Sequence, residues 1–255
     1  MIALIDGDLI VYRCAASCEP TKSKPEREPL ISAISRADEL IYRILNRLAP
    51  EEYRVFLGGS ENFRKTLHSD YKANRTQPKP KHLDSVRNLL VEEWEAEVCA
   101  GYEADDAIGI AAREDTVICS IDKDLRQIPG AHYNFVKDEL TEVGKGEAIR
   151  NFYTQMLTGD SSDNVRGIDG IGPVRARRIL DGVSPEEMEA VVWNCYDDAG
   201  RSREEFLCNF SLLYILRDRS EFEYIETCIS EGKRPDVTEV SRLGYSRIAP
   251  GANQQ

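Results

Sequence analysis

The sequence predicts an α/β protein in which a mostly parallel sheet is flanked by helices and followed by an α-helical C-terminal part. Three observations support this. Short apolar runs typical of strands alternate with helical stretches over the first half of the chain. Beyond Gly146 the pattern is mostly helical, with Gly and Pro clustered between Gly159 and Pro173. The 255 residues, 41% of them hydrophobic, are enough for one large domain with a buried core.

The first half of the chain supplies the predicted strands. Residues Ile2–Ile5 form an apolar run that we expect to be a buried strand running into a loop at "DGD", and "YRVFLGG" and "TVICSI" indicate two more strands. Helical spacing of apolar residues predicts helices over Leu30–Leu48 and Leu83–Trp94. The segments "HYNFV" and "ELTEV" are expected to pair as a hairpin. After Arg234 the pattern fades, so the last residues are expected to be loosely held.

Composition bounds the class of protein. The net charge is -12, which by itself argues against a nucleic-acid partner unless the acids hold cations and the bases are concentrated elsewhere. The chain has seven cysteines, an odd number, and none of them forms a CxxC motif, so neither a disulfide framework nor a zinc site is indicated. Cys99 and Cys119 are expected to be core residues. No signal peptide or membrane span is apparent. We therefore expect a cytoplasmic protein.

Carboxylates recur where the predicted strands end. In a parallel sheet the C-terminal strand ends share one edge, so these side chains are expected to come together there. Within "GYEADD", the first and last acids are three apart on a helix and share a face. The acids concerned are Asp6, Asp8, Glu103, Asp105, Asp106, Asp122, Asp124, Asp160 and Asp163.

Each acid also has an ordinary structural interpretation. Asp105 and Asp106 suit the start of a helix, and Asp6 or Asp160 suits a turn. As a group they are harder to explain in that way, since two carboxylates ~4 Å apart repel by about 4 kcal/mol at an effective dielectric of 20. Such a cluster must protonate or bind cations, and all-oxygen ligands favour Mg²⁺ or Mn²⁺. Two bridged divalent ions are suited to phosphodiester hydrolysis.

Basic residues are concentrated in two places. The segment from Arg64 to Lys81 contains six Lys or Arg residues and a single acid, Asp70. Phe63 and Tyr71 offer aromatic surfaces on which a nucleic-acid base could stack. A solvated loop is the alternative interpretation of this run. The stretch "GIDGIGPVRARRIL" has the pattern of a helix–hairpin–helix, in which small residues let backbone N–H groups approach DNA phosphates without reading sequence. A plain helix turn is the alternative there.

The motifs "IDGD", "DYKANR", "GYEADD", "SIDKDL" and "TGDSSDNVRGIDGIG" occur in an order that resembles the 5′-nuclease (flap endonuclease) family, over about residues 2–180. The tailed-phage branch looks most similar. The resemblance implies a PIN-like α/β nuclease domain at residues 1–157, with a basic arch at about 60–82. It also implies a helical region at 158–255 with a helix–three-turn–helix DNA-binding element at about 158–182.

The resemblance also implies roles for particular residues. Asp6, Glu103, Asp105, Asp106, Asp122, Asp124, Asp160 and Asp163 match the family's metal-site acids, and Asp8 is a further candidate, either as a ligand or as a residue that contacts the ligands. Lys72 and Arg75 match catalytic residues that contact the scissile phosphate, and Tyr71 matches a tyrosine that stacks on a base. The expected DNA-binding residues are Arg64, Tyr71, Lys72, Arg75, Gly167, Gly170, Gly172 and Arg175.

The implied activity is a structure-selective 5′→3′ exonuclease or flap endonuclease with a two-metal mechanism and 5′-phosphate products. The implied cofactors are two Mg²⁺ ions, with Mn²⁺ as a substitute, and K⁺ is a candidate ion at the hairpin. Expected partners are DNA with 5′ ends, flaps or nicks and RNA–DNA hybrids, including RNA primers; no membrane partner is expected, and the protein is expected to be a monomer.

One position departs from the family pattern. Where the family has an aspartate after the second strand, "FLGGSENFR" places Gly59, with no acid before Glu61. Two alternatives therefore remain beside the nuclease: a metal-deficient, non-catalytic DNA-binding protein of the same fold, and a PIN-type ribonuclease, which the hairpin pattern disfavours. Whether Glu61 replaces the missing acid is left open by the sequence.

Overall fold

The computed structural model describes residues 1–233, 235 and 236, which form parts of two compact units. The first unit comprises residues 1–60, 77–123 and 130–142, and the second comprises 61–76, 124–129 and 143 onward. The expected boundary between residues 157 and 158 differs from this interleaved division. The expectation of a loosely held end after Arg234 falls almost entirely outside the described residues.

A six-stranded sheet forms the centre of the first unit, in the order β3-β2-β1-β4-β5-β6. β1 pairs in parallel with β2 and with β4, and the β2–β3 and β4–β5 pairs are parallel as well, which confirms the mostly parallel sheet. The expected hairpin segments are neighbours as β5 and β6. The strands are β1 (Ile2–Asp6), β2 (Glu52–Leu57), β3 (Glu97–Val98), β4 (Thr116–Cys119), β5 (Gly130–Asn134) and β6 (Glu139–Val143).

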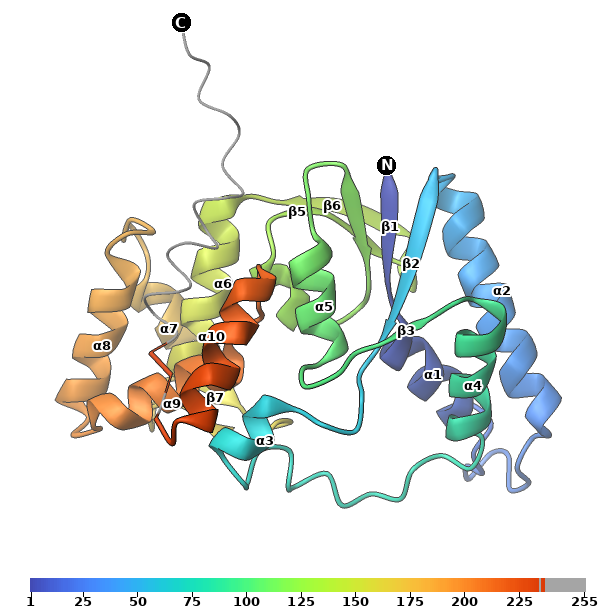
Figure 1. Ribbon diagram of the computed structural model, residues 1–255, viewed down its shortest axis with the longest axis horizontal. Coiled ribbons are helices and arrows are strands. Elements are labelled where there is room, and N and C mark those ends of the chain that lie inside the picture. The colour runs from blue at the N-terminus through green and yellow to red at the C-terminus, as the bar shows by residue number, and fades with distance from the viewer. Residues whose placement is uncertain (234, 237–255) are drawn as a thin grey trace, which may run out of the picture. The chain divides into compact units, whose positions relative to one another are not determined.

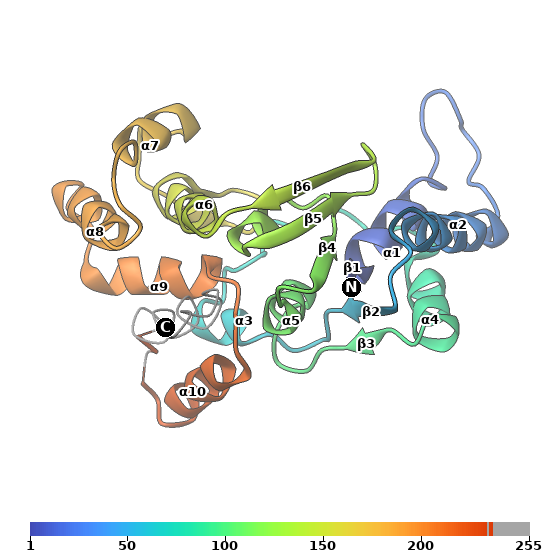
Figure 2. The same ribbon diagram turned by 90° about the horizontal axis from the view of Figure 1, so that it is seen from above.

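Helices cover both faces of this sheet. Figure 2 shows α1, α2 and α4 on one side of β1 and β2, and α5 on the other. Side chains alternate between the two faces along a strand, which explains both layers. Ala3 and Ile5 belong to the core beneath α1, α2 and α4, while Leu4 is buried on the opposite face. These helices are α1 (Gly7–Ala16), α2 (Leu30–Leu48), α4 (Leu83–Glu93) and α5 (Ala104–Ala111).

The turn after β1 differs from expectation. We expected a loop at "DGD", but α1 begins at Gly7, with Asp6 as its N-cap. A Cβ at Gly7 would lie 2.6 Å from the Phe56 carbonyl oxygen, so glycine permits the strand to pass directly into the helix beside β2. The last residue of β1 and the first turn of α1 are thereby held in a fixed geometry.

The second unit is mainly helical, as predicted for the C-terminal part. Its elements are α3 (Phe63–Leu67), the short 3₁₀ helix η1 (Asp124–Gln127), α6 (Lys145–Thr158), β7 (Gly159–Asp160), β8 (Val165–Arg166), α7 (Pro173–Ile179), α8 (Met188–Asp198), α9 (Arg203–Leu213) and α10 (Arg219–Ser230) (Figure 1). β7 and β8 pair antiparallel.

Aromatic side chains fill the core of the second unit. The rings of Phe152 on α6 and Phe210 on α9 meet edge to face with centroids 4.7 Å apart. The hydroxyl of buried Tyr196 on α8 donates to the Met156 carbonyl at 2.7 Å and accepts from the Asn209 amide at 2.9 Å. Packing and these two hydrogen bonds therefore tie α6, α8 and α9 together.

Arg64, at the start of the basic segment, belongs to this core. Its side chain is 2% exposed, stacks on the Phe63 ring, and donates to the carbonyls of Leu212 at 3.0 Å and Tyr214 at 2.6 Å. These carbonyls end α9, where a helix has no backbone donors of its own to offer. Arg64 is thus a structural cap whose guanidinium is buried and hydrogen-bonded to these carbonyls, and its expected role in DNA binding remains a prediction.

Two general predictions can be compared with the described residues. All seven cysteines are free, and Cys99 and Cys119 are buried as expected. None of the helices in the described part of the chain combines the length and the apolar composition needed to span a bilayer.

Replacing Arg64 by Met should lower the free energy of unfolding by about 2–4 kcal/mol, because the two buried carbonyls lose their donors. The same replacement at exposed Arg175 is the matched control and should leave stability nearly unchanged. Urea unfolding measures both. An Arg64→Met protein as stable as the wild type would contradict the capping role.

Candidate metal and nucleic-acid sites

The carboxyl end of β1 carries a buried acid. Asp6 is 4% exposed; its Oδ1 accepts the Leu9 N–H at 3.0 Å and its Oδ2 accepts the Ser120 hydroxyl at 2.7 Å. Ser120 follows β4, and its oxygen accepts the Asp122 N–H at 3.0 Å. Burial raises the pKa of Asp6 to about 6; the two hydrogen bonds oppose the shift, and the charges of Asp8 and Asp122 add to it. The charged form of Asp6 is therefore costly unless a cation compensates it.

Asp8 reaches from α1 to the end of β2. Its Oδ2 accepts the Gly58 N–H at 2.8 Å, and its Oδ1 pairs with Arg87 of α4 at 3.2 Å. Arg87 also donates to the Gly58 carbonyl at 2.6 Å, so one guanidinium holds both the acid and the glycine turn. Burial raises the pKa of Asp8, the Gly58 N–H and Arg87 lower it, and the charge of Glu103 raises it further. The acids therefore form a series in which each one is close enough to the next for their charges to interact: Asp122 to Asp6, Asp6 to Asp8, and Asp8 to Glu103.

The acids of "GYEADD" have a local structural role that can be seen directly. Glu103 is the N-cap of α5, and its N–H donates to Asp106 Oδ2 at 3.0 Å within a capping box. Asp106 is fully buried, and Asp105 lies in the first turn. The capping box explains why acids suit this helix start, and in it the buried carboxylate of Asp106 accepts a backbone hydrogen bond.

The side chains fit a hard divalent ion by their chemistry. All candidates are carboxylates, the ligands that Mg²⁺ and Mn²⁺ favour, and the buried charge of Asp6 calls for a cation. Among residues 1–233, 235 and 236, no three His, Cys, Asp or Glu side chains stand close enough together to hold a metal ion. An ion would have to draw the carboxylates closer together to be held by three of them. The metal ligands remain a prediction.

Gly59 admits no side chain on this backbone. A Cβ at this position would lie 2.1 Å from the carbonyl oxygen of Cys99, far inside van der Waals contact. An aspartate at position 59 therefore requires the segment after β3 to move. The missing family acid is thus a property of the local backbone as well as of the side chain.

In the second unit, three side chains from residues 70–75, which we call the arch base, converge on one acid. Asp163 Oδ1 pairs with Arg75 at 2.6 Å, and Oδ2 accepts the Tyr71 hydroxyl at 3.0 Å with the Lys72 ammonium 3.5 Å away. The Lys72 ammonium also lies 4.9 Å from the centre of the Tyr71 ring. From the sequence we expect Lys72 and Arg75 to bind a phosphate and Asp163 to bind a metal; the contacts between these residues could not be predicted from their spacing in the chain.

Backbone contacts reinforce this convergence. The acid lies in residues 160–164, which we call the carboxylate loop. The Lys72 N–H donates to the Asp163 carbonyl at 2.9 Å, Asn74 donates to the Ser161 carbonyl at 2.6 Å, and Asn164 donates back to the Asp70 carbonyl at 2.8 Å. Tyr71 is only 3% exposed, so its ring is not available for base stacking in this conformation.

The other acids of this unit are also fixed. Asp160 is buried; it accepts the N–H and hydroxyl of Ser162 at 2.7 and 2.6 Å and the Gln155 amide at 3.1 Å. Asp124 opens η1, which is attached to α6 because the Asn151 amide donates to the Arg126 carbonyl at 3.0 Å. Both acids are therefore positioned by α6 and the residues that follow it.

The glycines of the expected hairpin have different roles. A Cβ at Gly167 would lie 2.2 Å from the Thr158 carbonyl carbon, so this glycine is required by internal packing. Gly170 has a φ of +78°, whereas Gly172 is the N-cap of α7 and a Cβ there would meet nothing within 4 Å. Ile168 and Ile171 are buried, while Val174 and Arg175 are exposed. The exposed part of the turn is thus Gly170 together with residues 172–175.

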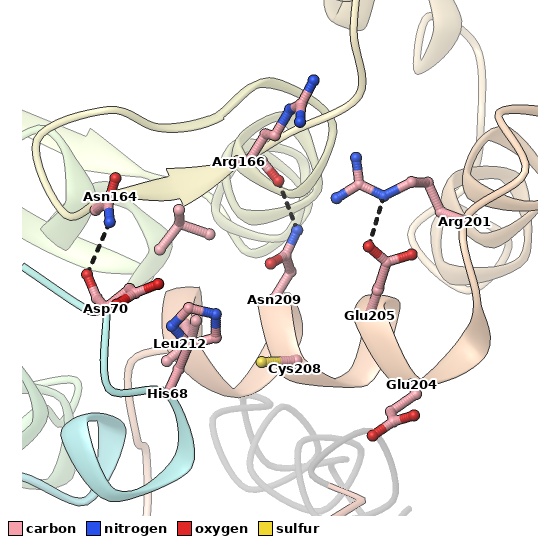
Figure 3. A pocket seen from close by; sticks show the side chains of 11 residues that line it. His68, Asp70, Asn164, Arg166, Arg201, Glu204, Glu205, Cys208, Asn209 and Leu212 are labelled. Carbon is pink, nitrogen blue, oxygen red and sulfur yellow. Dashed lines mark hydrogen bonds and ion pairs between the residues drawn. The ribbon is translucent and has the colours of Figure 1, made fainter.

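A cleft of about 380 Å³ in the second unit was not anticipated from the sequence (Figure 3). Its lining includes His68 and Cys208, with Arg201 paired to Glu205 at 3.0 Å and Asn209 donating to the Arg166 carbonyl at 2.8 Å. Several of its polar groups pair with one another, whereas the buried Nδ1 of His68 has no hydrogen-bond partner within the described part of the chain. No sequence motif marked His68, Arg201, Cys208 or Asn209.

Comparison with known proteins places the fold and the motifs in one family. The family model described as 5'-3' exonuclease, N-terminal resolvase-like domain, matches residues 1–157. DNA polymerase I of Rhizobium leguminosarum is 30% identical over 246 residues, which cover 84% of this chain and 24% of that protein. Flap endonuclease Xni of Shewanella frigidimarina is 29% identical over 71% of this chain and 76% of its own length. This chain thus spans about a quarter of the polymerase and most of the shorter relative.

Solved structures show the same fold. The bacteriophage T5 D15 protein co-crystallised with metal ions has a TM-score of 0.63 at 16% identity, with 98% of this chain and 99% of that chain covered. Flap endonuclease-1 from Methanococcus jannaschii has a TM-score of 0.57 at 14% identity, with 97% and 91% covered. The PIN-like sheet and its flanking helices are therefore confirmed. With a family model over more than half of its length and acids at the matched strand ends, the chain belongs to the 5′→3′ exonuclease family.

Proposed function

We propose that this chain is a structure-selective 5′→3′ exonuclease or flap endonuclease that hydrolyses DNA phosphodiesters near 5′ ends and leaves 5′-phosphates. The observation that carries the proposal is the buried, destabilised carboxylate of Asp6, which lies beside Asp8 and Asp122 at the ends of parallel strands. Family membership supports it. A non-catalytic DNA-binding protein is disfavoured, because such a protein would gain nothing from acids whose burial raises their pKa.

The proposed ligands of two divalent ions are Asp6, Glu103, Asp105, Asp106, Asp122, Asp124, Asp160 and Asp163. When bound, two Mg²⁺ or Mn²⁺ ions supply activation of the attacking water and stabilisation of the leaving 3′-oxygen. Asp8 is proposed as an additional acid for a chain that lacks one at position 59. It suits this role because Gly58 and Arg87 fix its carboxylate at the end of β2 and leave lone pairs for a cation.

Lys72 and Arg75 are proposed to bind the scissile phosphate and stabilise the charge that develops on it during attack. Gly170, Gly172 and Arg175 are proposed to hold the phosphate backbone of duplex DNA, with K⁺ as a candidate ion at the same turn. Contacts of this kind follow the backbone and carry no sequence information. Flaps, nicks and RNA–DNA hybrids are the proposed substrates, and a monomer is the proposed state.

Asp122→Asn should lower cleavage of a 5′-labelled flap in Mg²⁺ by at least about 100-fold, because the acid follows β4 in the cluster around Asp6. Asp8→Asn should keep activity but need more Mg²⁺. Duplex binding in Ca²⁺ should survive in both variants, and EDTA should abolish cleavage by the wild type.

The matched control for these variants is Asp138→Asn, since Asp138 is also paired with an arginine, Arg47, at 2.8 Å but lies on the β5–β6 turn. It should titrate with Mg²⁺ as the wild type does. Normal turnover by Asp122→Asn at ordinary Mg²⁺ would overturn the two-metal proposal, and cleavage of RNA–DNA hybrids alone would redirect it to a ribonuclease.

The raised pKa of Asp6 predicts a pH effect in metal-free protein. A carboxyl with a raised folded-state pKa contributes stability that is present below about pH 4 and is lost as the pH rises through about 6. Between pH 5 and 7.5 the wild type should therefore lose about 1–2 kcal/mol relative to Asp6→Asn in EDTA. Added Mg²⁺ should raise the wild-type Tm much more at pH 7.5 than at pH 5. Parallel stability curves for the two proteins would contradict the assigned burial of the charge.

Gly172→Val tests the hairpin without disturbing the fold, because nothing lies within 4 Å of the added Cβ. Duplex affinity should fall by roughly tenfold on unrelated sequences, since the side chain holds the DNA backbone away from the turn. Gly144→Val is the matched control: Gly144 is the N-cap of α6, and its Cβ position is equally open. A Gly172→Val protein that binds duplex as well as Gly144→Val does would remove this turn from the interface.

A further inference from the structure

The arch base offers three donors to a single anion. Arg75 binds one oxygen of Asp163, while the Tyr71 hydroxyl and the Lys72 ammonium approach the other. A guanidinium, an ammonium and a hydroxyl that converge on two oxygens of one negative group also suit a phosphodiester, which likewise carries one negative charge on two free oxygens. The protein therefore contains, in its own chain, an anion placed where these donors would receive a phosphate.

The contact is built into the backbone. Lys72 and Asn164 both adopt left-handed conformations, with φ of 59° and 60°, which are uncommon outside glycine. Hydrogen bonds run in both directions, from Lys72 and Asn74 to the carboxylate loop and from Asn164 to the arch base. A chance collision of charged side chains would not require two such residues opposite each other.

We propose that Asp163 is an autoinhibitory occupant of the phosphate position formed by Tyr71, Lys72 and Arg75, which an entering DNA phosphate must displace. The proposal rests on the proposed function of Lys72 and Arg75 as phosphate-binding groups. It also gives Tyr71 a different role from base stacking: its hydroxyl holds the occupant, and its ring supports the Lys72 ammonium.

The exchange is energetically accessible. Arg75 is 56% exposed, so its pair with Asp163 is worth little against water and can be replaced by another anion. Tyr71 is buried and leaves its partner less readily. Phosphate entry thus begins at Arg75 and is completed when Asp163 releases Lys72 and Tyr71.

The displaced carboxylate has to find a positive partner. A divalent cation provides one if Asp163 acts as a metal ligand, as proposed above, so that DNA and the cation each favour binding of the other. Such coupling is reciprocal: the factor by which the cation raises DNA affinity equals the factor by which DNA raises cation affinity. Asp163 is then the residue through which part of this coupling passes.

The test uses Asp163→Asn in EDTA, where neither cleavage nor a metal contributes. Two quantities are measured: the affinity for a 5′-flap DNA, and nitration of Tyr71 by tetranitromethane, resolved by peptide mass spectrometry because the chain has 11 tyrosines. Loss of the occupant should raise flap affinity by about tenfold and Tyr71 nitration several-fold over the wild type. The further gain in flap affinity on adding Ca²⁺ should shrink in the variant.

Asp160→Asn is the matched control, because it removes the same charge from the same loop. Asp160 accepts from Ser162 and from Gln155 of α6, in contrast to the Tyr71, Lys72 and Arg75 donors on Asp163. An equal rise in flap affinity for both variants would reduce the effect to simple charge removal and overturn the proposal. Unchanged affinity and unchanged nitration in Asp163→Asn would overturn it as well.

Two further variants separate the possible failures. If Asp163→Asn does not fold, Asn74→Ala removes the hydrogen bond to the Ser161 carbonyl without changing any charge, and it should raise Tyr71 nitration to a smaller extent. In Mg²⁺, Lys72→Ala should lower the single-turnover rate far more than it lowers affinity. Normal cleavage by Lys72→Ala would show that the phosphate role itself is wrong. A slowed Lys72→Ala together with a silent Asp163→Asn would reject the occupant alone.

Discussion

The parallel pairing of β1 with β2 on one side and β4 on the other is the constraint on which the cluster of Asp6, Asp8 and Asp122, here called the acidic edge, depends. It places the ends of these strands on one edge, so that Asp6, Asp8 and Asp122 share a small region partly closed to water. Ser120 and the glycine turns at Gly7 and Gly58 serve the same arrangement by fixing the carboxylates in orientation. Burial makes the charges costly, and this cost is the physical basis of the cation binding that we propose for these residues.

Much of this arrangement could be predicted from sequence periodicity. Apolar runs ending in acids located β1 and β4, helical spacing located α2 and α4, and the order of motifs indicated the family. Properties that depend on neighbours distant in sequence could not be predicted in this way. Arg64 resembles its basic neighbours in composition, yet it caps α9 almost 150 residues further on. Gly167 and Gly172 belong to one glycine pattern, but one packs against Thr158 and the other faces open space.

Charge is distributed unevenly in a chain with an overall charge of -12. The bases of the arch base are engaged by an acid of the carboxylate loop, and Asp8 is engaged by Arg87. The sequence shows the sign of each charged side chain but not its partner, so the acids are expected to bind metal and the bases to bind DNA without contacts between the two groups. In the structure several of these groups have internal partners, so that binding of metal or DNA would involve exchange of partners in addition to attraction.

The close approach of Gly59 to the Cys99 carbonyl also limits how such a chain can change over time. A single substitution that brings back an acid at position 59 introduces a collision at 2.1 Å before it provides any benefit. The segment after β3 would have to shift first, and that shift alone gains nothing. Regaining the acid would therefore take at least two coordinated changes, whereas Asp8 and Arg87 already provide a fixed carboxylate beside Gly58.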